Sequence, residues 1–347
     1  MPRITPRIRR SAAVAVALVA GATLAPAGAA NASTTSAPAT APVTKGLYQS
    51  AYSERNHALW TTSAVGRPPV TTSALTKLDP VTLKVEATYT PPVTDAATGA
   101  VEAVYGIAVD DEHNTVWVTN TRDNTVAVYS QRNGAHLATL PNVAHAREVV
   151  VDEKHDTVWA SGFGDGSVVG FDSRTFAEKK RVTVEGAGPT GLAVDGRTGT
   201  VYAADLTNDQ LIEVTRKSTK PRLIPTGDGP ISVALSRNGR TAYTADNTAG
   251  TVSVVDLRKG LVTKSVPTGA GTLSVAGDDR SGKVVAVNRT DATATVVDPR
   301  KGSVVKTVRT GANPNHVELT RGTAYVADKS GTGPAGEDTV TRFRVAK

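Results

Sequence analysis

Three histidines stand at equivalent positions of a repeating pattern and are the first residues that could bind a metal ion. His57, His113 and His155 each occur three or four residues before a tryptophan. Imidazole nitrogens are common ligands of transition metals. Equivalent positions of a repeat lie on separate structural units, so these three side chains cannot converge on one ion. We therefore interpret them as turn residues.

Acidic pairs could bind calcium through carboxylate oxygens, and they occur at Asp110–Asp111, Asp278–Asp279 and Glu337–Asp338. The first two follow apolar runs where a turn is expected, and aspartate is favoured there for its local hydrogen bonds. Neither has the ligand spacing of a dedicated calcium loop. We expect turn residues and no cofactor, although the sequence leaves open a calcium or magnesium ion in a central channel.

Two glycine-rich segments, Gly162–Ser167 and Gly331–Gly336, are similar to phosphate-binding loops. Such a loop needs a helix N-terminus behind it to hold the anion, and no helical pattern follows either segment. No serine stands in a nucleophile elbow with histidine and aspartate partners. The sequence therefore favours a binding protein over an enzyme.

The elements that must position these residues recur about every forty residues. A four-residue unit opens on an aromatic or β-branched residue and usually ends on Asn or Asp, and successive copies start 57, 42, 43, 41, 42 and 40 residues apart. The seven copies are Trp60–Ser63, Trp117–Asn120, Trp159–Gly162, Tyr202–Asp205, Tyr243–Asp246, Val285–Asn288 and Tyr325–Asp328. This period predicts an all-β, seven-bladed β-propeller.

The clearest period predicts four antiparallel strands per blade. Alternating residues occur at Ile231–Leu235, Thr241–Asp246, Thr251–Asp256 and Leu261–Val266, and Asn238–Gly239 marks the first hairpin turn. Three glycines mark crossings between blades, where we expect them to supply backbone freedom: Gly227, Gly269 and Gly311.

The last period lacks its outer strand. It contains only Asn315–Leu319, Thr323–Asp328 and Thr339–Val345. Residues near Ala39–Val43 can supply the missing strand by pairing with Thr339–Val345. We therefore predict that an N-terminal strand closes the ring and removes an open sheet edge.

Residues 1–32 have the pattern of a cleavable signal peptide. A basic start precedes the apolar run Ala12–Leu24 and the small residues Ala30–Ala32. The pair Arg9–Arg10 leaves open whether export follows the general or the twin-arginine route. Residues 33–44 read as a flexible Ser/Thr/Ala/Pro-rich tail and residues 45–347 as one propeller domain. We expect a secreted protein with no membrane span.

Charge and cysteine content narrow the classes of partner. The chain has no cysteine, which excludes disulfides and thiolate metal sites. The net charge is +7, but four arginines and no acidic residue lie in residues 1–32, so the remainder carries +3. A net charge of +3 gives a weaker positive electrostatic field than a dedicated nucleic-acid binder would have. We expect a monomer.

The candidate site lies where three long loops gather. Val65–Ser73, Val93–Ala103 and Lys329–Asp338 exceed the repeat length and should lie on one face and one side of the ring. The starts of the inner strands face the same side. They should bring a polar ring to the channel mouth, made of Tyr105, His145, Arg147, Glu148, Thr190, Asn313, Asn315 and His316. Arg147 and Glu148 differ most from the residues at the same positions of other repeats. They are either part of a binding site or an ion pair with each other or with neighbours.

The repeats resemble the YVTN family of β-propellers, best over Trp117–Val128 and Tyr243–Asp256. The chain also resembles the YncE-type exported propellers over residues 45–347. The segments that carry this resemblance are Lys45–Ser53, Ala58–Trp60, Leu78–Val85, Arg147–Asp152 and Pro314–Leu319. The resemblance implies a seven-bladed exported propeller without a firmly assigned enzymatic activity, and single-stranded DNA as one candidate ligand.

The sequence therefore predicts a secreted propeller that binds an unknown ligand or protein partner at the channel mouth. Two alternatives stay open. Single-stranded nucleic-acid binding would need aromatic platforms beside a basic groove. The residues that could begin such a surface are Tyr105, Phe163 and Arg147. A metal-dependent hydrolase or lyase would need a ring of carboxylates at the inner strands, where Glu148 is the clear example.

Overall fold

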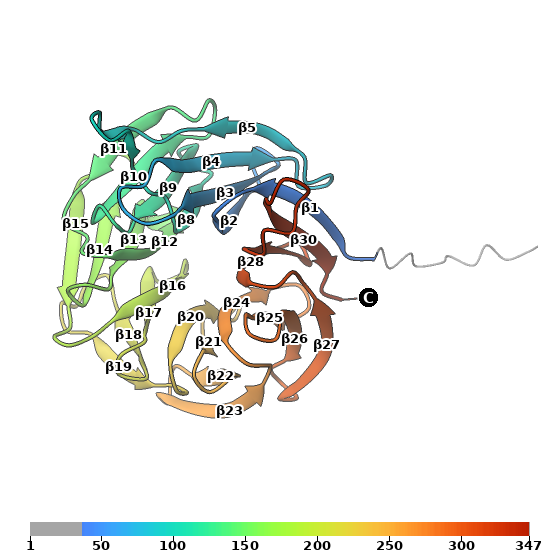
Figure 1. Cartoon of the computed structure of the whole chain (residues 1–347). Coiled ribbons are helices and arrows are strands. Elements are labelled where there is room, and N and C mark those ends of the chain that lie inside the picture. Colours follow the sequence, from blue (N-terminus) through green and yellow to red (C-terminus); the bar gives the residue numbers. More distant parts are fainter. Residues whose placement is uncertain (1–36, 347) are drawn as a thin grey trace, which may run out of the picture. The chain divides into compact units, whose positions relative to one another are not determined.

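Seven four-stranded antiparallel sheets stand around a central axis (Figure 1). The structure is a computed structural model that describes residues 37–346. The predicted all-β, seven-bladed propeller is confirmed. Among the described residues, no helix has the length and apolar character that a membrane crossing requires. The predicted signal peptide lies outside the described residues.

Each blade runs outward from the channel. In six blades the four strands follow one another along the chain, and in the seventh the outermost strand comes from residues 39–44. The first three blades contain β2 (Leu47–Ser53), β3 (Ala58–Val65), β4 (Thr72–Leu78) and β5 (Val85–Tyr89); β8 (Ile107–Asp110), β9 (Thr115–Asn120), β10 (Thr125–Ser130) and β11 (His136–Leu140); and β12 (Ala146–Asp152), β13 (Thr157–Gly162), β14 (Ser167–Asp172) and β15 (Glu178–Thr183). A short hairpin of β6 (Val93–Asp95) and β7 (Ala100–Val101) precedes blade two, and the 3-10 turn η1 (Glu153–His155) lies in blade three.

The remaining blades repeat this arrangement. They contain β16 (Pro189–Asp195), β17 (Thr200–Asp205), β18 (Gln210–Val214) and β19 (Arg222–Pro225); β20 (Pro230–Leu235), β21 (Thr241–Asp246), β22 (Thr251–Asp256) and β23 (Leu261–Pro267); β24 (Thr272–Asp278), β25 (Lys283–Asn288), β26 (Thr293–Asp298) and β27 (Ser303–Arg309); and β28 (Pro314–Thr320), β29 (Thr323–Asp328) and β30 (Asp338–Arg344) with β1 (Ala39–Thr44).

The residue that opens each repeated unit lies in the second strand and fills the interface with the next blade. Trp60 is fully buried and belongs to a cluster with Ile107 and Val116 of blade two. Tyr325 of blade seven packs in the same way against Leu59 of blade one. Large aromatic side chains bury much apolar area, so the repeat is the signature of the interfaces that hold the blades together.

Strand β1 closes the ring. It pairs antiparallel with β30, with Ala39 opposite Arg342 and Ala41 opposite Val340. The predicted closure by an N-terminal strand is therefore confirmed. The strand also takes residues 39–44 out of the expected flexible tail. The composition of that segment suggested a spacer, but its alternating half-buried side chains lie against blade seven.

Two of the crossing glycines owe their place to close packing rather than to an unusual backbone. A Cβ atom on Gly227 would lie 2.2 Å from Asp246 Oδ2, and one on Gly311 would lie 2.5 Å from Asp328 Oδ1. Neither has a positive φ, whereas Gly269 has a φ of 148°. The crossing therefore runs directly against the acidic end of a second strand.

Candidate functional site

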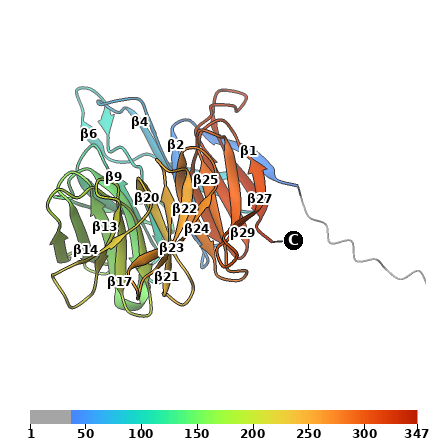
Figure 2. The ribbon, with the colours of Figure 1, turned by 90° about the horizontal axis from the view of Figure 1, so that it is seen from below.

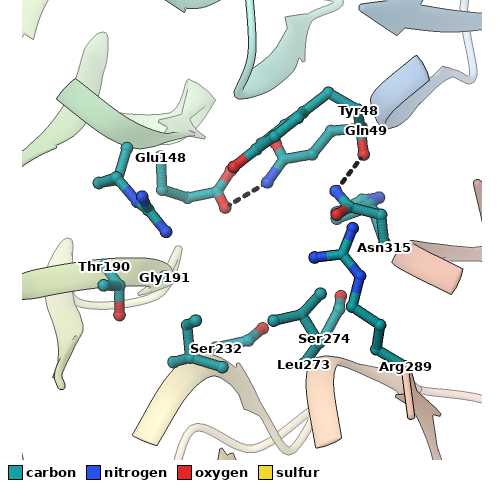
Figure 3. A pocket seen from close by; sticks show the side chains of 13 residues that line it. Tyr48, Gln49, Glu148, Thr190, Gly191, Ser232, Leu273, Ser274, Arg289 and Asn315 are labelled. Carbon is teal, nitrogen blue, oxygen red and sulfur yellow. Dashed lines mark hydrogen bonds between the residues drawn. The ribbon is translucent and has the colours of Figure 1, made fainter. Parts of the chain in front are cut away.

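Most of the inner strands contain a β-bulge near the channel mouth, and the bulge directs additional side chains toward the channel. The ladder between first and second strands changes register in six blades, at Leu47/Ser50, Ala146/Val149, Pro189/Leu192, Pro230/Ser232, Thr272/Ser274 and Pro314/His316. A bulge bends the strand and re-aims its side chains. The bypassed residues line a cavity of about 210 Å³ at the axis, which we call the mouth cavity. Figure 3 shows this cavity.

Most of the residues predicted for the site gather at this mouth. Five of them line the mouth cavity: Arg147, Glu148, Thr190, Asn315 and His316. Tyr105 and His145 line an adjoining side hollow of about 230 Å³, which shares Tyr48 and Arg147 with the mouth cavity. Asn313 lines neither. It is exposed, and its backbone N–H bonds Asp328 Oδ1 at 3.3 Å.

Glu148 is held by a neutral partner rather than by an arginine. Gln49 Nε2 donates to Glu148 Oε2 at 2.9 Å, and Gln49 Oε1 accepts from the backbone N–H of Ile107 at 3.1 Å. Burial raises the pKa of Glu148 to about 7, against the opposing effects of the Gln49 bond and the Arg147 charge. The two neighbours Arg147 and Glu148 do not form the ion pair that sequence left open, since Arg147 has no carboxylate oxygen within 4.0 Å in residues 37–346.

Two further titratable groups stand deeper in the channel. The backbone N–H of Ser50 donates to His316 Nδ1 at 3.3 Å, which leaves the ring proton on Nε2. Burial lowers the pKa of His316 to about 4, so the ring is neutral at pH 7. Glu318 lines the hollow at the opposite end of the channel. Burial, and then the charges of Glu54 and Glu148, raise the pKa of Glu318 to about 7.

Four cations surround the mouth without a carboxylate partner. Arg147 and Arg289 line the mouth cavity, and Arg122, Arg147 and Lys329 line the side hollow. Over residues 37–346, none of the four forms an ion pair within 4.0 Å. Their charges act on one another: burial and then Arg289 lower the pKa of Lys329, although Asp338 opposes this. The mouth therefore has four cationic side chains and one lining carboxylate, Glu148.

Aromatic rings flank these cations. Tyr48 and Tyr105 meet edge to face with their ring centres 5.0 Å apart. Lys329 Nζ lies 5.2 Å from the centre of the Tyr48 ring, and the Arg147 guanidinium carbon lies 5.7 Å from that of Phe163. Cation–π contacts of this kind orient a cation without neutralising it.

The three long loops gather beside this mouth, as predicted. The backbone N–H of Val101 donates to the Val70 carbonyl at 2.9 Å, which joins the first two loops. The third loop reaches blade one through Asp338 Oδ2, which accepts from the Leu47 N–H at 2.8 Å. β4 and β6 rise toward the same face of the propeller (Figure 2).

Sequence reasoning missed several of the residues that give the mouth its character: Tyr48, Gln49, Arg122, Arg289 and Lys329. Arg289 and Lys329 directly follow the last residues of two repeated units. The equivalent residues of blades three and five are Phe163 and Asn247. A comparison of that single position across the repeats could have found both cations.

The other sequence candidates have local partners. His57 Nδ1 bonds Tyr52 Oη, while His113 and His155 Nδ1 bond Asp110 and Asp152, so the three histidines lie at turns on three different blades. Gly162–Ser167 forms the turn between β13 and β14, with no helix behind it.

Comparisons with known proteins agree with the propeller fold and find sequence similarity to one group of proteins. No family model matches the chain. Over 235 residues, the chain is 26% identical to a YncE protein of Salmonella typhi and 27% identical to that of Escherichia coli (strain K12), both described as uncharacterised. These matches span 63% of this chain and 64% of each relative's length.

The solved structure of a streptogramin B lyase has the same fold. Its TM-score is 0.71 at 11% identity, over 89% of this chain and 97% of that chain. Identity this low concerns the fold alone. The chain is thus a seven-bladed β-propeller with sequence similarity to YncE proteins.

Proposed function

We propose that this propeller is a binding scaffold that takes a small anionic ligand at its channel mouth. The observation that carries the proposal is the group of four cations, Arg122, Arg147, Arg289 and Lys329, without a carboxylate partner in residues 37–346. Partly buried like charges repel each other, and water screens them less than at an open surface. A carboxylate or phosphate group between them would offset that repulsion.

The shape of the mouth favours a small ligand. Arg289 extends into the mouth cavity on the side of Asn315, with Thr190 across the cavity (Figure 3). Arginine binds carboxylate and phosphate oxygens through strong charge-assisted hydrogen bonds. The volume of about 210 Å³ is below the roughly 300–1,000 Å³ of pockets for drug-sized ligands. We therefore favour an anion of a few heavy atoms, or the charged end of a larger molecule.

The two alternatives fit the mouth less well. A single nucleic-acid strand could stack on Tyr48, Tyr105 or Phe163, but the cations lie in two compact hollows rather than along a groove. A metal-dependent hydrolase would have Glu148 as the one carboxylate among the residues lining the mouth cavity. Arg147 and Arg289 would repel a metal ion there.

Calorimetric titration with inorganic phosphate, with succinate and with a single-stranded oligothymidine tests the proposal. Arg147→Ala should weaken binding of the small anion by about 1–3 kcal/mol, the range for one charged hydrogen bond. Lys154 is the matched control, because it lies in η1 on the opposite face and bonds the Arg197 carbonyl at 3.4 Å. Equal effects of Arg147→Ala and Lys154→Ala would remove the channel mouth as the site. Binding of the oligonucleotide alone would favour nucleic acid.

We also propose that the protein acts outside the cytoplasm, as the predicted signal peptide suggests. Release of a shortened chain into the medium or the cell envelope, identified by N-terminal sequencing, tests this.

A further inference from the structure

A second group of ligand-type side chains lies on the face opposite the channel mouth. Glu112 and His113 belong to the turn between β8 and β9, and Asp156 follows η1 in the equivalent turn of blade three. One donor atom from each lies within 4.8 Å of the other two. The group therefore bridges blades two and three, and it is independent of the mouth cavity.

The histidine of this group is already oriented for an outward-facing ligand atom. Asp110 is fully buried, accepts from the His113 backbone N–H at 2.9 Å, and lies 2.8 Å from His113 Nδ1. A carboxylate at Nδ1 keeps the proton on that nitrogen and leaves a lone pair on Nε2. Nε2 faces Asp156 Oδ1 at 3.5 Å. Metal-binding histidines are commonly fixed by such a carboxylate behind the ring.

A guanidinium lies between two of these ligands and marks a position that a cation can take. Arg174 Nε lies 3.2 Å from His113 Nε2 and 3.1 Å from Asp156 Oδ1. Arginine only donates hydrogen bonds, so Nε2 must offer its lone pair there. The Arg174 side chain is 60% exposed, and exposed ion pairs contribute only about 0–1 kcal/mol. A metal ion could therefore displace the guanidinium at little energetic cost.

We propose that Glu112, His113 and Asp156 bind a divalent transition-metal cation of the zinc class, which replaces the Arg174 guanidinium and joins blades two and three. One imidazole nitrogen and two carboxylate oxygens are zinc ligands, and water can complete the coordination. Calcium and magnesium prefer oxygen ligands alone, so the nitrogen selects against them.

The next turn along the ring provides an internal control. His155 Nδ1 lies 2.7 Å from Asp152 Oδ2, in the same histidine–carboxylate pair. Lys154 stands there in place of Glu112. His155 therefore shares the orientation of His113 but has a cation where His113 has a carboxylate neighbour.

Calorimetric titration of the purified protein, without a histidine tag and at pH 7, tests the site with Zn²⁺ and separately with Ca²⁺. We expect one equivalent of Zn²⁺ and no saturable Ca²⁺ binding at this site. Glu112→Gln and His113→Gln should each weaken Zn²⁺ binding at least tenfold. Arg174→Ala should strengthen it several-fold, because the competing cation is gone. His155→Gln should leave it unchanged.

The outcomes separate a built site from incidental binding. Equal losses in His113→Gln and His155→Gln, or Zn²⁺ binding that Glu112→Gln and Arg174→Ala leave unchanged, would overturn the proposal. Glu112 is exposed, so its variant keeps the test decisive if His113→Gln fails to fold. Zinc should also raise the melting temperature of the wild type, but not that of Glu112→Gln, because the ion links two blades.

Discussion

Replacing Glu148 with glutamine should stabilise the protein at alkaline pH and change little at acidic pH. Burial raises the pKa of Glu148 from 4.5 to about 7, so the folded protein holds this proton more tightly than the unfolded chain does. The free energy of unfolding therefore falls as the pH rises from 4.5 to 7. The full difference corresponds to roughly 3 kcal/mol. We expect about 1–3 kcal/mol, because the side chain is only partly shielded from water.

Urea unfolding at pH 5, 6.5 and 8, followed by tryptophan fluorescence, measures this difference. Glutamine at position 148 can still accept the hydrogen bond that Gln49 now donates to Glu148, so the geometry of the mouth should survive. The matched control is Glu185→Gln, at an exposed loop position between β15 and β16. A Glu148→Gln advantage that is the same at all three pH values, or equalled by the control, would refute burial as the cause.

Three further predictions concern stability. Deleting residues 33–45 should clearly lower the melting temperature, because β30 would lose its outer partner; an unchanged value would mean that the pairing is dispensable. Gly227→Ala should destabilise the fold by about 1–3 kcal/mol in a denaturation assay, because the added Cβ would meet Asp246. The control is Gly196→Ala, which should be neutral in the same assay because a Cβ on Gly196 meets nothing within 4 Å. Acidification from pH 6.5 to 4 should destabilise the protein in part through His316, whose pKa is lowered to about 4, because the unfolded chain takes up that proton first. His316→Asn should flatten this part of the pH profile.

The strands could be predicted because packing between blades requires similar residues at the same position of each repeat. The interfaces need an aromatic or branched residue at one position of each second strand, and this spacing placed Thr241–Asp246 correctly. The missing fourth strand of the last period then required a partner from elsewhere in the chain, which is β1. The close approach of Asp246 to Gly227 could not be predicted, because sequence shows that glycine is present and not which atoms approach it.

The site was predictable only where it follows the phase of the repeat. Arg147 and Glu148 stand at an inner-strand start, and the bulge there turns both toward the channel. Asn313 precedes the corresponding bulge and stays outside. Arg289 lies in a hairpin turn, where the direction of a side chain depends on turn geometry rather than on alternation. Contacts such as His113 with Asp156 depend on the angle between blades, which no pattern within one blade encodes.

The pairing of β1 with β30 joins the two ends of the described chain. Thr40 Oγ1 and Thr341 Oγ1 lie 2.9 Å apart although 301 residues separate them in the chain. β1 therefore precedes its partner by most of the described chain, and the edge of β1 that pairs stays open until β30 is available. A chain that stops short of Arg344 has no complete mate for this strand. Without β30, the inner edge of β1 would stay exposed, and such an edge is prone to pair with another chain.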